Sequence, residues 1–191
     1  VGIVGLGAVG RSLAKKLHSF GVGRLIGWNR STFRLEVNEL VDECGLGLMV
    51  MEEVFKKSDA VVVAITLNPK TRRLVSKEVL SLLRLDGILI NISRGAVVDE
   101  EALADLAYEG KLGGVGLDVY SVEPPDKPFE ASFMKKLVIA AEMGRNVILT
   151  PHNAATSKNN ATKIALQVGK NVLGVLYGMT EGIEIVKTDQ Q

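Results

Sequence analysis

Three polar residues of this 191-residue chain stand where side chains could act together on a small molecule: Arg94, Glu123 and His152. They lie in the stretches NISRGAVVDEEAL, GLDVYSVEPP and LTPHNAA, each directly after an apolar run. An arginine can bind a carboxylate through two parallel hydrogen bonds, and a histidine can donate or accept a proton near neutral pH. A carboxylate beside the histidine fixes its tautomer and holds its proton more firmly. Such a set suits carbonyl reduction, in which Arg94 orients an anionic substrate and His152 protonates the developing alkoxide.

Each of these residues has an ordinary alternative when it is taken singly. An arginine after a strand is more often part of a surface ion pair, and a glutamate before two prolines is more often a turn residue. The catalytic interpretation therefore depends on whether the fold brings the three stretches to one place.

Seven short runs of apolar residues predict the strands that would position these side chains. Their hydrophobicity is continuous rather than alternating, which indicates strands buried on both faces, as in a parallel sheet. The runs cover residues 1–5, 25–28, 46–50, 59–65, 87–92, 113–120 and 146–151. Helical patterns separate them at 9–20, 33–44, 76–83 and 100–108, with Ser76 placed as an N-cap. The alternation predicts a doubly wound α/β (Rossmann) domain, whose strand ends share one ligand-binding edge.

The end of the chain has a different pattern. Apolar residues from Ala161 to Leu176 fall at helical spacings and predict one helix of about 20 residues that ends at Gly178. We expect a dinucleotide-binding domain over 1–155 and a C-terminal helix and tail over 156–191. The stretch 124–145 also predicts an extra helical turn.

The motif GLGAVG lies between the first predicted strand and the first predicted helix. In a G-x-G-x-x-G loop the first glycine permits a tight turn, the second lets a pyrophosphate approach the backbone, and the third lets helix and strand pack closely. The following helix N-terminus offers amides and partial positive charge to the phosphates. The predicted pyrophosphate loop consists of Gly5, Gly7, Ala8, Val9 and Gly10. The alternative is a glycine-rich turn of an unrelated α/β domain.

The end of the second predicted strand bears on the choice of cofactor. An NAD-binding domain usually carries an acidic residue there for the ribose 2′-hydroxyl, whereas this chain reads GWNRS. Asn29 removes the repulsion that a 2′-phosphate would meet, Arg30 can bind that phosphate, and Ser31 can add a hydrogen bond. We predict that NADP is preferred and that NAD is possible. The alternative is that Arg30 is a solvated surface residue.

Composition narrows the class of protein. The formal charge is +1, with 23 basic and 22 acidic side chains, and no charged arm indicates binding to nucleic acid or a membrane surface. No apolar run approaches the roughly 18 residues of a transmembrane helix. The single cysteine, Cys44, is interpreted as a small buried hydrophobe, which fits a reducing, cytoplasmic setting. No metal site is predicted.

Nearly the whole chain resembles the nucleotide-binding domain of the D-isomer-specific 2-hydroxyacid dehydrogenases. The resemblance runs from GLGAVG through SDAVVVAITLNPKTRRLV, INISRGAVVDEEAL and GLDVYSVEP to TPHNAAT and KNVLGVLYG. It implies that Arg94 binds the substrate carboxylate and carbonyl, that His152 is the acid/base, and that Glu123 supports it. It also implies that Asp118 lies near the nicotinamide amide and that Ser93 and the backbone around Thr66 line the cofactor.

Within that family, WNRS and NISRG most resemble the glyoxylate/hydroxypyruvate reductase branch, which favours NADPH. The resemblance thus implies hydride transfer between NAD(P)H and a small 2-oxo acid, in an enzyme that is commonly a homodimer. The family's substrate domain is expected outside these 191 residues, so the chain alone should bind cofactor yet turn over poorly. Two alternatives stay open: an NAD(P)-sensing protein of the corepressor type, and a dehydrogenase for another acid such as phosphoglycerate, lactate or formate.

Overall fold

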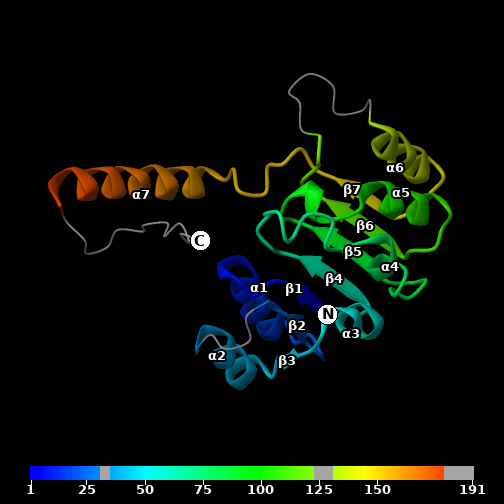
Figure 1. Ribbon diagram of the computed structural model, residues 1–191, viewed down its shortest axis with the longest axis horizontal. Helices are drawn as coiled ribbons and strands as arrows, with labels where there is room; N and C mark the ends of the chain where they lie inside the picture. Colours follow the sequence, from blue (N-terminus) through cyan, green and yellow to red (C-terminus); the bar gives the residue numbers. More distant parts are fainter. Residues whose placement is uncertain (31–34, 123–130, 179–191) are drawn as a thin grey trace. The chain divides into compact units, whose positions relative to one another are not determined.

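Seven parallel strands form one sheet, with helices on both of its faces (Figure 1). The computed structural model describes residues 1–30, 35–122 and 131–178, with only the backbone of residues 35 and 36. The strands are β1 (Gly2–Val4), β2 (Ile26–Trp28), β3 (Gly47–Leu48), β4 (Ala60–Val63), β5 (Ile88–Asn91), β6 (Gly114–Leu117) and β7 (Val147–Leu149). Their order in the sheet is β3-β2-β1-β4-β5-β6-β7. Each of the seven predicted runs contains one strand, so the doubly wound parallel fold is confirmed, with shorter strands than the apolar runs.

Helices connect successive strands, and one more helix follows β7. They are α1 (Ala8–Ser19), α2 (Leu35–Cys44), α3 (Met51–Lys57), α4 (Lys77–Leu80), the 3-10 turn η1 (Gly95–Val97), α5 (Glu100–Tyr108), α6 (Ser132–Glu142) and α7 (Lys158–Tyr177). The extra turn predicted between 124 and 145 is in fact an 11-residue helix, α6. It buries Phe133, Met134 and Leu137, and this apolar face explains why the segment is a full helix.

The chain divides into two compact units, Val1–Pro151 and His152–Gln191. The first contains the sheet and the helices α1 to α6. The second contains α7, whose 20 residues end at Gly178 in the left-handed conformation (φ 65°), as the sequence predicts.

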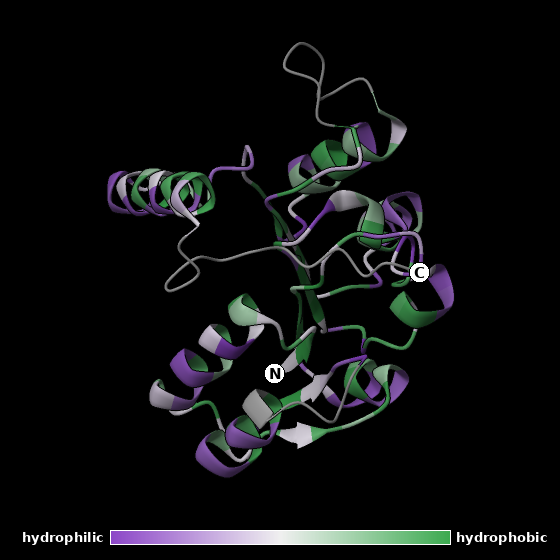
Figure 2. Ribbon diagram, turned by 60° about the vertical axis from the view of Figure 1, so that its left-hand side comes forward, coloured by the Kyte–Doolittle hydropathy of each residue, from purple (hydrophilic) through white to green (hydrophobic). Residues whose placement is uncertain are grey.

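Two hydrophobic layers cover the two faces of the sheet in the first unit. Helices α1 and α2 pack on β1 through a cluster that contains Ile3, Leu40 and Cys44. Helices α3 to α6 pack on the opposite face through a larger cluster, to which β1 contributes the next residue, Val4. Neighbouring residues of a strand thus enter different layers, as the alternation of side chains requires. Figure 2 shows the hydrophobic strands between helices that carry hydrophilic outer surfaces.

Between β1 and β4 the connecting helices change from one face of the sheet to the other, and this change locates the ligand-binding edge. From β1 the chain proceeds outward to β2 and β3, then returns to β4 beside β1 and continues the other way to β7. Right-handed crossovers place helices on opposite faces for these two directions. The loops after β1 and β4 therefore diverge and leave a crevice, which is where open α/β sheets bind their ligands.

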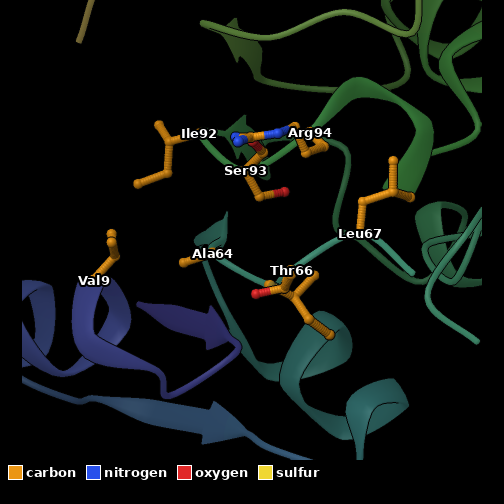
Figure 3. Close-up of a pocket in the computed structure, with 8 residues that line it drawn as sticks. Val9, Ala64, Thr66, Leu67, Ile92, Ser93 and Arg94 are labelled. Carbon is orange, nitrogen blue, oxygen red and sulfur yellow. The ribbon is translucent and has the colours of Figure 1, made fainter. Parts of the chain in front are cut away.

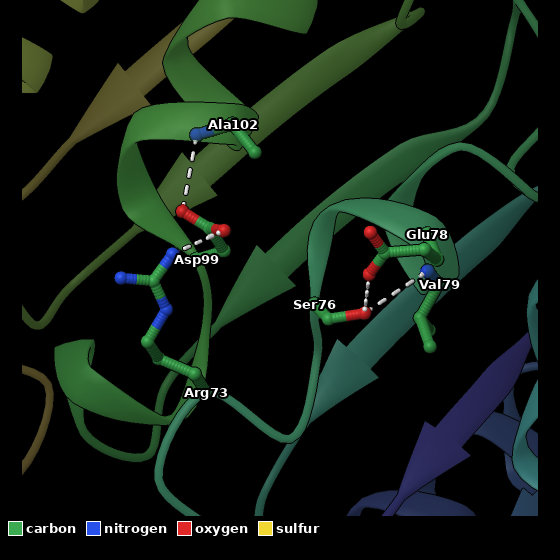
Figure 4. A network of polar contacts seen from close by, with 6 residues as sticks. All are labelled: Arg73, Ser76, Glu78, Val79, Asp99 and Ala102. Atoms are coloured by element: carbon green, nitrogen blue, oxygen red, sulfur yellow. Dashed lines mark hydrogen bonds and ion pairs between the residues drawn. The ribbon is translucent and has the colours of Figure 1, made fainter.

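Side-chain caps define the starts of two helices near this edge (Figure 4). Ser76 caps α4 by accepting a hydrogen bond from the Val79 amide at 3.5 Å, which confirms its predicted role. Asp99 caps α5 by accepting from the Ala102 amide at 3.3 Å, and it also receives a 2.6 Å hydrogen bond from Arg73. The Arg73 guanidinium thereby ties the loop after β4 to the loop after β5.

Candidate cofactor and substrate site

The glycines of the loop after β1 have different surroundings. Gly5 has a φ of +99°, and a Cβ there would lie 2.7 Å from the Ala64 carbonyl oxygen. A Cβ at Gly10 would lie 2.0 Å from the Gly5 carbonyl oxygen, so only glycine lets α1 begin this close to the strand. A Cβ at Gly7 would meet nothing within 4 Å. The loop is therefore packed tightly on its inner side and open at Gly7, which is the shape that a pyrophosphate needs.

The start of α1 is also electrostatically suited to a phosphate. Gly7 is the N-cap, and the first turn of the helix contains no acidic residue. The Leu6 peptide is fixed on both sides, because its N–H donates to Asn29 Oδ1 at 3.2 Å and its carbonyl accepts from Arg11 Nη1 at 3.3 Å. The amides of the helix start and the nearby Arg11 guanidinium favour an anion at this point.

Two cavities lie side by side along the crevice. The larger, of about 350 Å³, is lined from α1 by Val9, from the end of β4 by Ala64 to Leu67, and from the end of β5 by Ile92 to Arg94. In Figure 3, Val9, Ala64 and Thr66 lie on one side of this space and Ile92, Ser93 and Arg94 on the other. The smaller cavity, of about 190 Å³, is lined by Gly5, Leu6, Gly7, Asn29, Arg30, Ala64, Ile65, Thr66, Asn68 and Thr71.

These cavities bring together most of the residues predicted to bind cofactor. Gly5, Gly7, Asn29 and Arg30 line the smaller cavity, Val9 and Ser93 line the larger one, and Thr66 lines both. Ala8 is exposed at the start of α1, and Gly10 is buried behind the loop. Ser31 lies outside the described residues.

The loop after β4 is held by one buried hydroxyl that the sequence analysis missed. Thr71 is 3% exposed, and its Oγ1 accepts from the Asn68 amide at 2.8 Å and donates to the Thr66 carbonyl at 2.7 Å. Because Thr66 and Thr71 both line the smaller cavity, this threonine shapes the wall of the site from inside the loop. A threonine within a polar loop gives no periodic signal that could have singled it out.

Arg94 lies at the rim of the larger cavity. Its side chain is exposed, and its Nη1 donates to the Ser93 carbonyl at 2.7 Å. Ser93 itself is buried and donates its hydroxyl to Asn91 Oδ1 at 2.8 Å. An exposed guanidinium above an apolar cavity can bind an anionic group at the cavity mouth.

Asp118 follows the end of β6, and its side chain is 7% exposed. Its carboxylate accepts from Thr150 Oγ1 at 2.6 Å. The Tyr120 hydroxyl also reaches the end of β7, donating to the Thr150 carbonyl at 2.8 Å. The ends of β6 and β7 are thus joined by side chains as well as by the sheet.

Two of the three predicted catalytic residues are not placed relative to Arg94. His152 is the first residue of the second unit and has a φ of 52°. Glu123 lies outside the described residues, although the preceding Ser121 amide is held by both carboxylate oxygens of the buried Glu100 at 3.0 and 3.1 Å. The convergence of Arg94, Glu123 and His152 stays a prediction.

Two further observations concern the described residues 1–30, 35–122 and 131–178. These residues contain no group of three His, Cys, Asp or Glu side chains arranged to hold a metal ion. Over the same ranges, no helix is both long and apolar enough to span a membrane.

A doubly wound parallel sheet with this glycine loop is typical of the dinucleotide-binding domains of dehydrogenases. Residues 1–154 match the model of the D-isomer specific 2-hydroxyacid dehydrogenase, NAD binding domain. The chain therefore belongs to this family, as its motifs indicate.

Individual relatives act on different substrates. A glyoxylate reductase of Thermococcus onnurineus is 33% identical over 178 residues, which are 93% of this chain and 48% of that protein. A D-3-phosphoglycerate dehydrogenase of Methanocaldococcus jannaschii is 29% identical over 180 residues, which cover 93% of this chain and 31% of that protein. The crystal structure of D-lactate dehydrogenase from Aquifex aeolicus with NAD and lactic acid superimposes with a TM-score of 0.80 at 27% identity, over 95% of this chain and 54% of that one. The chain spans about half the length of the glyoxylate reductase.

Proposed function

We propose that this chain binds NADPH in the crevice between β1 and β4 and is part of a reductase of small 2-oxo acids, glyoxylate or hydroxypyruvate foremost. The observation that carries the proposal is the continuity of the site. An open glycine loop at a helix start leads along two adjoining cavities to an exposed arginine. A dinucleotide needs the first part, and an anionic substrate beside its nicotinamide needs the arginine.

The preference for NADPH is supported by the end of β2. Asn29 is neutral, and its Oδ1 already accepts the Leu6 amide at 3.2 Å, so it does not act as the carboxylate that holds a ribose diol. Arg30 is exposed beside it and lines the same cavity. A guanidinium at this point attracts a 2′-phosphate and can bind it with charge-assisted hydrogen bonds.

The proposed chemistry assigns a separate task to each residue. A bound NADPH would supply the hydride that reduces the substrate carbonyl. Arg94 binds the substrate carboxylate, orients the carbonyl and stabilises the negative charge that develops on its oxygen. His152 gives a proton to that oxygen, and Glu123 holds the imidazole in the orientation that this transfer needs. Asp118 orients the carboxamide of the cofactor.

The substrate class is supported by what the relatives have in common. Glyoxylate, D-3-phosphoglycerate and lactic acid, which their names give, all carry a carboxylate next to a carbonyl or hydroxyl carbon. One exposed arginine suffices to recognise that shared group. The higher identity to glyoxylate reductases and the Asn29–Arg30 pair favour the reductases over a phosphoglycerate dehydrogenase.

Cofactor preference can be measured on this chain alone. Fluorescence titration with NADPH and NADH should give a lower Kd for NADPH. Arg30→Ala should weaken NADPH binding about 10- to 150-fold, because a hydrogen bond to a charged group contributes about 1.5–3 kcal/mol, and should leave NADH binding unchanged. Arg24→Ala is the matched control, since it removes the same charge from an exposed position before β2. Tighter binding of NADH by the unaltered chain contradicts the NADPH proposal.

Turnover is measured on the full-length gene product that contains this chain. NADPH fluorescence should decay on addition of glyoxylate or hydroxypyruvate, and more slowly or not at all with 3-phosphohydroxypyruvate. Intact NADPH binding without turnover of any 2-oxo acid would instead favour an NAD(P)-sensing protein.

A further inference from the structure

Asn91, the last residue of β5, is a polar residue in an apolar part of the sheet. Its side chain is fully buried at 0% exposure, and its partners in the neighbouring strands are Val63 and Leu117. Burial of an amide is unfavourable unless its donors and acceptors are paired. A valine or leucine would suit the packing at this position, so packing alone does not explain the amide.

The side chain of Asn91 is hydrogen-bonded to the loop that directly follows. Its Oδ1 accepts from the Ser93 amide at 3.0 Å and from the Ser93 hydroxyl at 2.8 Å, and its Nδ2 donates to the Arg94 carbonyl at 3.1 Å. These partners lie on both sides of the Arg94 Cα. One rigid amide group therefore sets the direction in which the Arg94 side chain leaves the backbone.

The main chain of Asn91 contacts the neighbouring strand end. Its carbonyl accepts from the Asp118 amide at 3.1 Å, and the Asp118 carboxylate is held in turn by Thr150 Oγ1 at 2.6 Å. Asn91 thus joins the loop of the proposed substrate-binding arginine to the residue proposed to orient the cofactor.

The far side of the Arg94 loop is closed by backbone. A Cβ at Gly95 would lie 2.0 Å from the Tyr120 carbonyl carbon and 2.1 Å from the Ser121 nitrogen. The Val97 amide also donates to the Arg94 carbonyl, at 3.2 Å. The Gly95 side of the loop is therefore filled by backbone, and the Asn91 amide holds the loop next to the strand through Ser93 and the Arg94 carbonyl.

We propose that Asn91 is a positioning residue: it fixes the backbone of Arg94 so that the guanidinium meets the substrate carboxylate at the mouth of the larger cavity. This inference rests on the proposed function, because it requires Arg94 to bind substrate. It adds a residue that touches neither substrate nor cofactor and yet determines how well the substrate is held.

The decisive variant is Asn91→Asp in the full-length gene product. A carboxylate of the same shape keeps the acceptor for Ser93, loses the donor to Arg94, and places an oxygen against the Arg94 carbonyl. The control is Asn146→Asp at the opposite end of the strands, an exposed asparagine whose amide Nδ2 likewise donates to a backbone carbonyl, that of Gly113 at 3.3 Å. Each variant is also made in an Arg94→Ala background.

We expect Asn91→Asp to lower kcat/KM for glyoxylate by about 10- to 100-fold, the order of effect of a misplacement of about 1 Å, with the Kd for NADPH at its wild-type value. In the Arg94→Ala background the same substitution should have no further effect, and Asn146→Asp should be neutral in both backgrounds. A stable Asn91→Asp variant with wild-type kcat/KM overturns the proposal. An equal loss with and without Arg94 also overturns it, since a general structural defect does not depend on that side chain. Absence of turnover in the unaltered enzyme removes the proposed function itself, and this inference with it.

A measurement on unaltered Asn91 makes the test independent of how the variants fold. With ¹⁵N-labelled asparagine, the Asn91 side-chain NH₂ resonance should shift when oxamate, an unreactive 2-carbonyl carboxylate, is added to the NADPH complex. The shift should disappear in Arg94→Ala, whose truncated side chain is exposed. An NH₂ resonance that does not shift on addition of oxamate, or that shifts equally in the Arg94→Ala variant, shows that Asn91 does not act through Arg94.

Discussion

The open position at Gly7 and the closed one at Gly10 predict opposite phenotypes for the same substitution. Gly7→Ala should leave the fold intact and weaken cofactor binding, whereas Gly10→Ala should destabilise the fold. The backbone at Gly7 has φ −71° and ψ −168°, which any residue can adopt, and its Cβ would contact nothing. That same space is where the pyrophosphate is expected to approach the loop.

The magnitudes follow from the geometry. At Gly10 the new Cβ lies 2.0 Å from the Gly5 oxygen, and a contact of at least 3.0 Å requires the start of α1 to move outward by about 1 Å (3.0 − 2.0). Overpacking of this kind costs about 1–3 kcal/mol, and here both atoms belong to stiff backbone, so the cost lies at the upper end. Alanine recovers up to about 1 kcal/mol through its better helix propensity. The net loss of about 2 kcal/mol lowers Tm by about 4–8 °C for a domain of this size.

At Gly7 the stability terms nearly cancel. Alanine is a poorer N-cap than glycine by up to about 1 kcal/mol, but it also lowers the conformational entropy of the unfolded chain, which stabilises the fold by about 0.4–1 kcal/mol. The Tm should therefore stay within about 3 °C of the wild-type value. The Kd for NADPH should rise at least about tenfold, which corresponds to about 1.4 kcal/mol of binding free energy.

The assay combines calorimetry without ligand and fluorescence titration with NADPH. Gly23→Ala serves as the control, because a Cβ there also meets nothing within 4 Å and the residue lies in the loop before β2. Wild-type affinity in Gly7→Ala would show that no phosphate approaches this glycine, and the assignment of the crevice as a dinucleotide site would then be wrong. A Gly10→Ala variant as stable as the wild type would refute the packing analysis.

Three side chains in the loops after β4 and β5 give further predictions. Thr71→Val keeps the shape of the residue but removes the hydrogen bonds of its hydroxyl, so the Kd for NADPH should rise and Tm should fall. Thr71→Ser should restore both values in titration and calorimetry. An unchanged Kd in the valine variant contradicts this role. Asp99→Ala removes the cap of α5 and should cost about 1 kcal/mol in urea unfolding, while Arg73→Ala should cost less because its ion pair is 66% exposed on the arginine side. Both Asp99 and Arg73 variants should bind NADPH as the wild type does, and a weakened Kd in either would link the caps to the site.

Much of the fold could be predicted because parallel strands are apolar on both faces. The run at 59–65 and the strand Ala60–Val63 are one example, and the capping serine at 76 is another. The ends of the strands were predicted less accurately, because hydrogen bonding between neighbouring strands, and not hydrophobicity, decides where a strand ends. The run 113–120 thus ends as a strand at Leu117, although Val119 beyond it is still buried.

The site was predictable where residue type alone carries the chemistry. Glycines, Asn29, Arg30 and Arg94 could be assigned from the motif and its place in the fold, and the structure puts them along one crevice. Thr71 and Asn91 could not, because their roles depend on hydrogen bonds with loop backbone whose path is set by other parts of the molecule. An asparagine at a strand end looks, in sequence, like the start of any turn.

The distribution of buried polar side chains distinguishes the two edges of the sheet. Among the described residues these side chains are Ser58, Thr71, Asn91, Ser93, Glu100 and Asp118. Ser58 is the exception, because it precedes β4. Asn91 is the last residue of β5, and the remaining four follow the carboxyl ends of β4, β5 or β6. A buried hydrogen bond contributes only about 1 kcal/mol net, and an apolar pair of the same shape would hold a loop about as well. Stability therefore gives no reason to gather these groups at one edge. Unlike apolar contacts, hydrogen bonds fix the direction of a loop, and direction is what a site needs when it must hold a nucleotide and a small acid in contact.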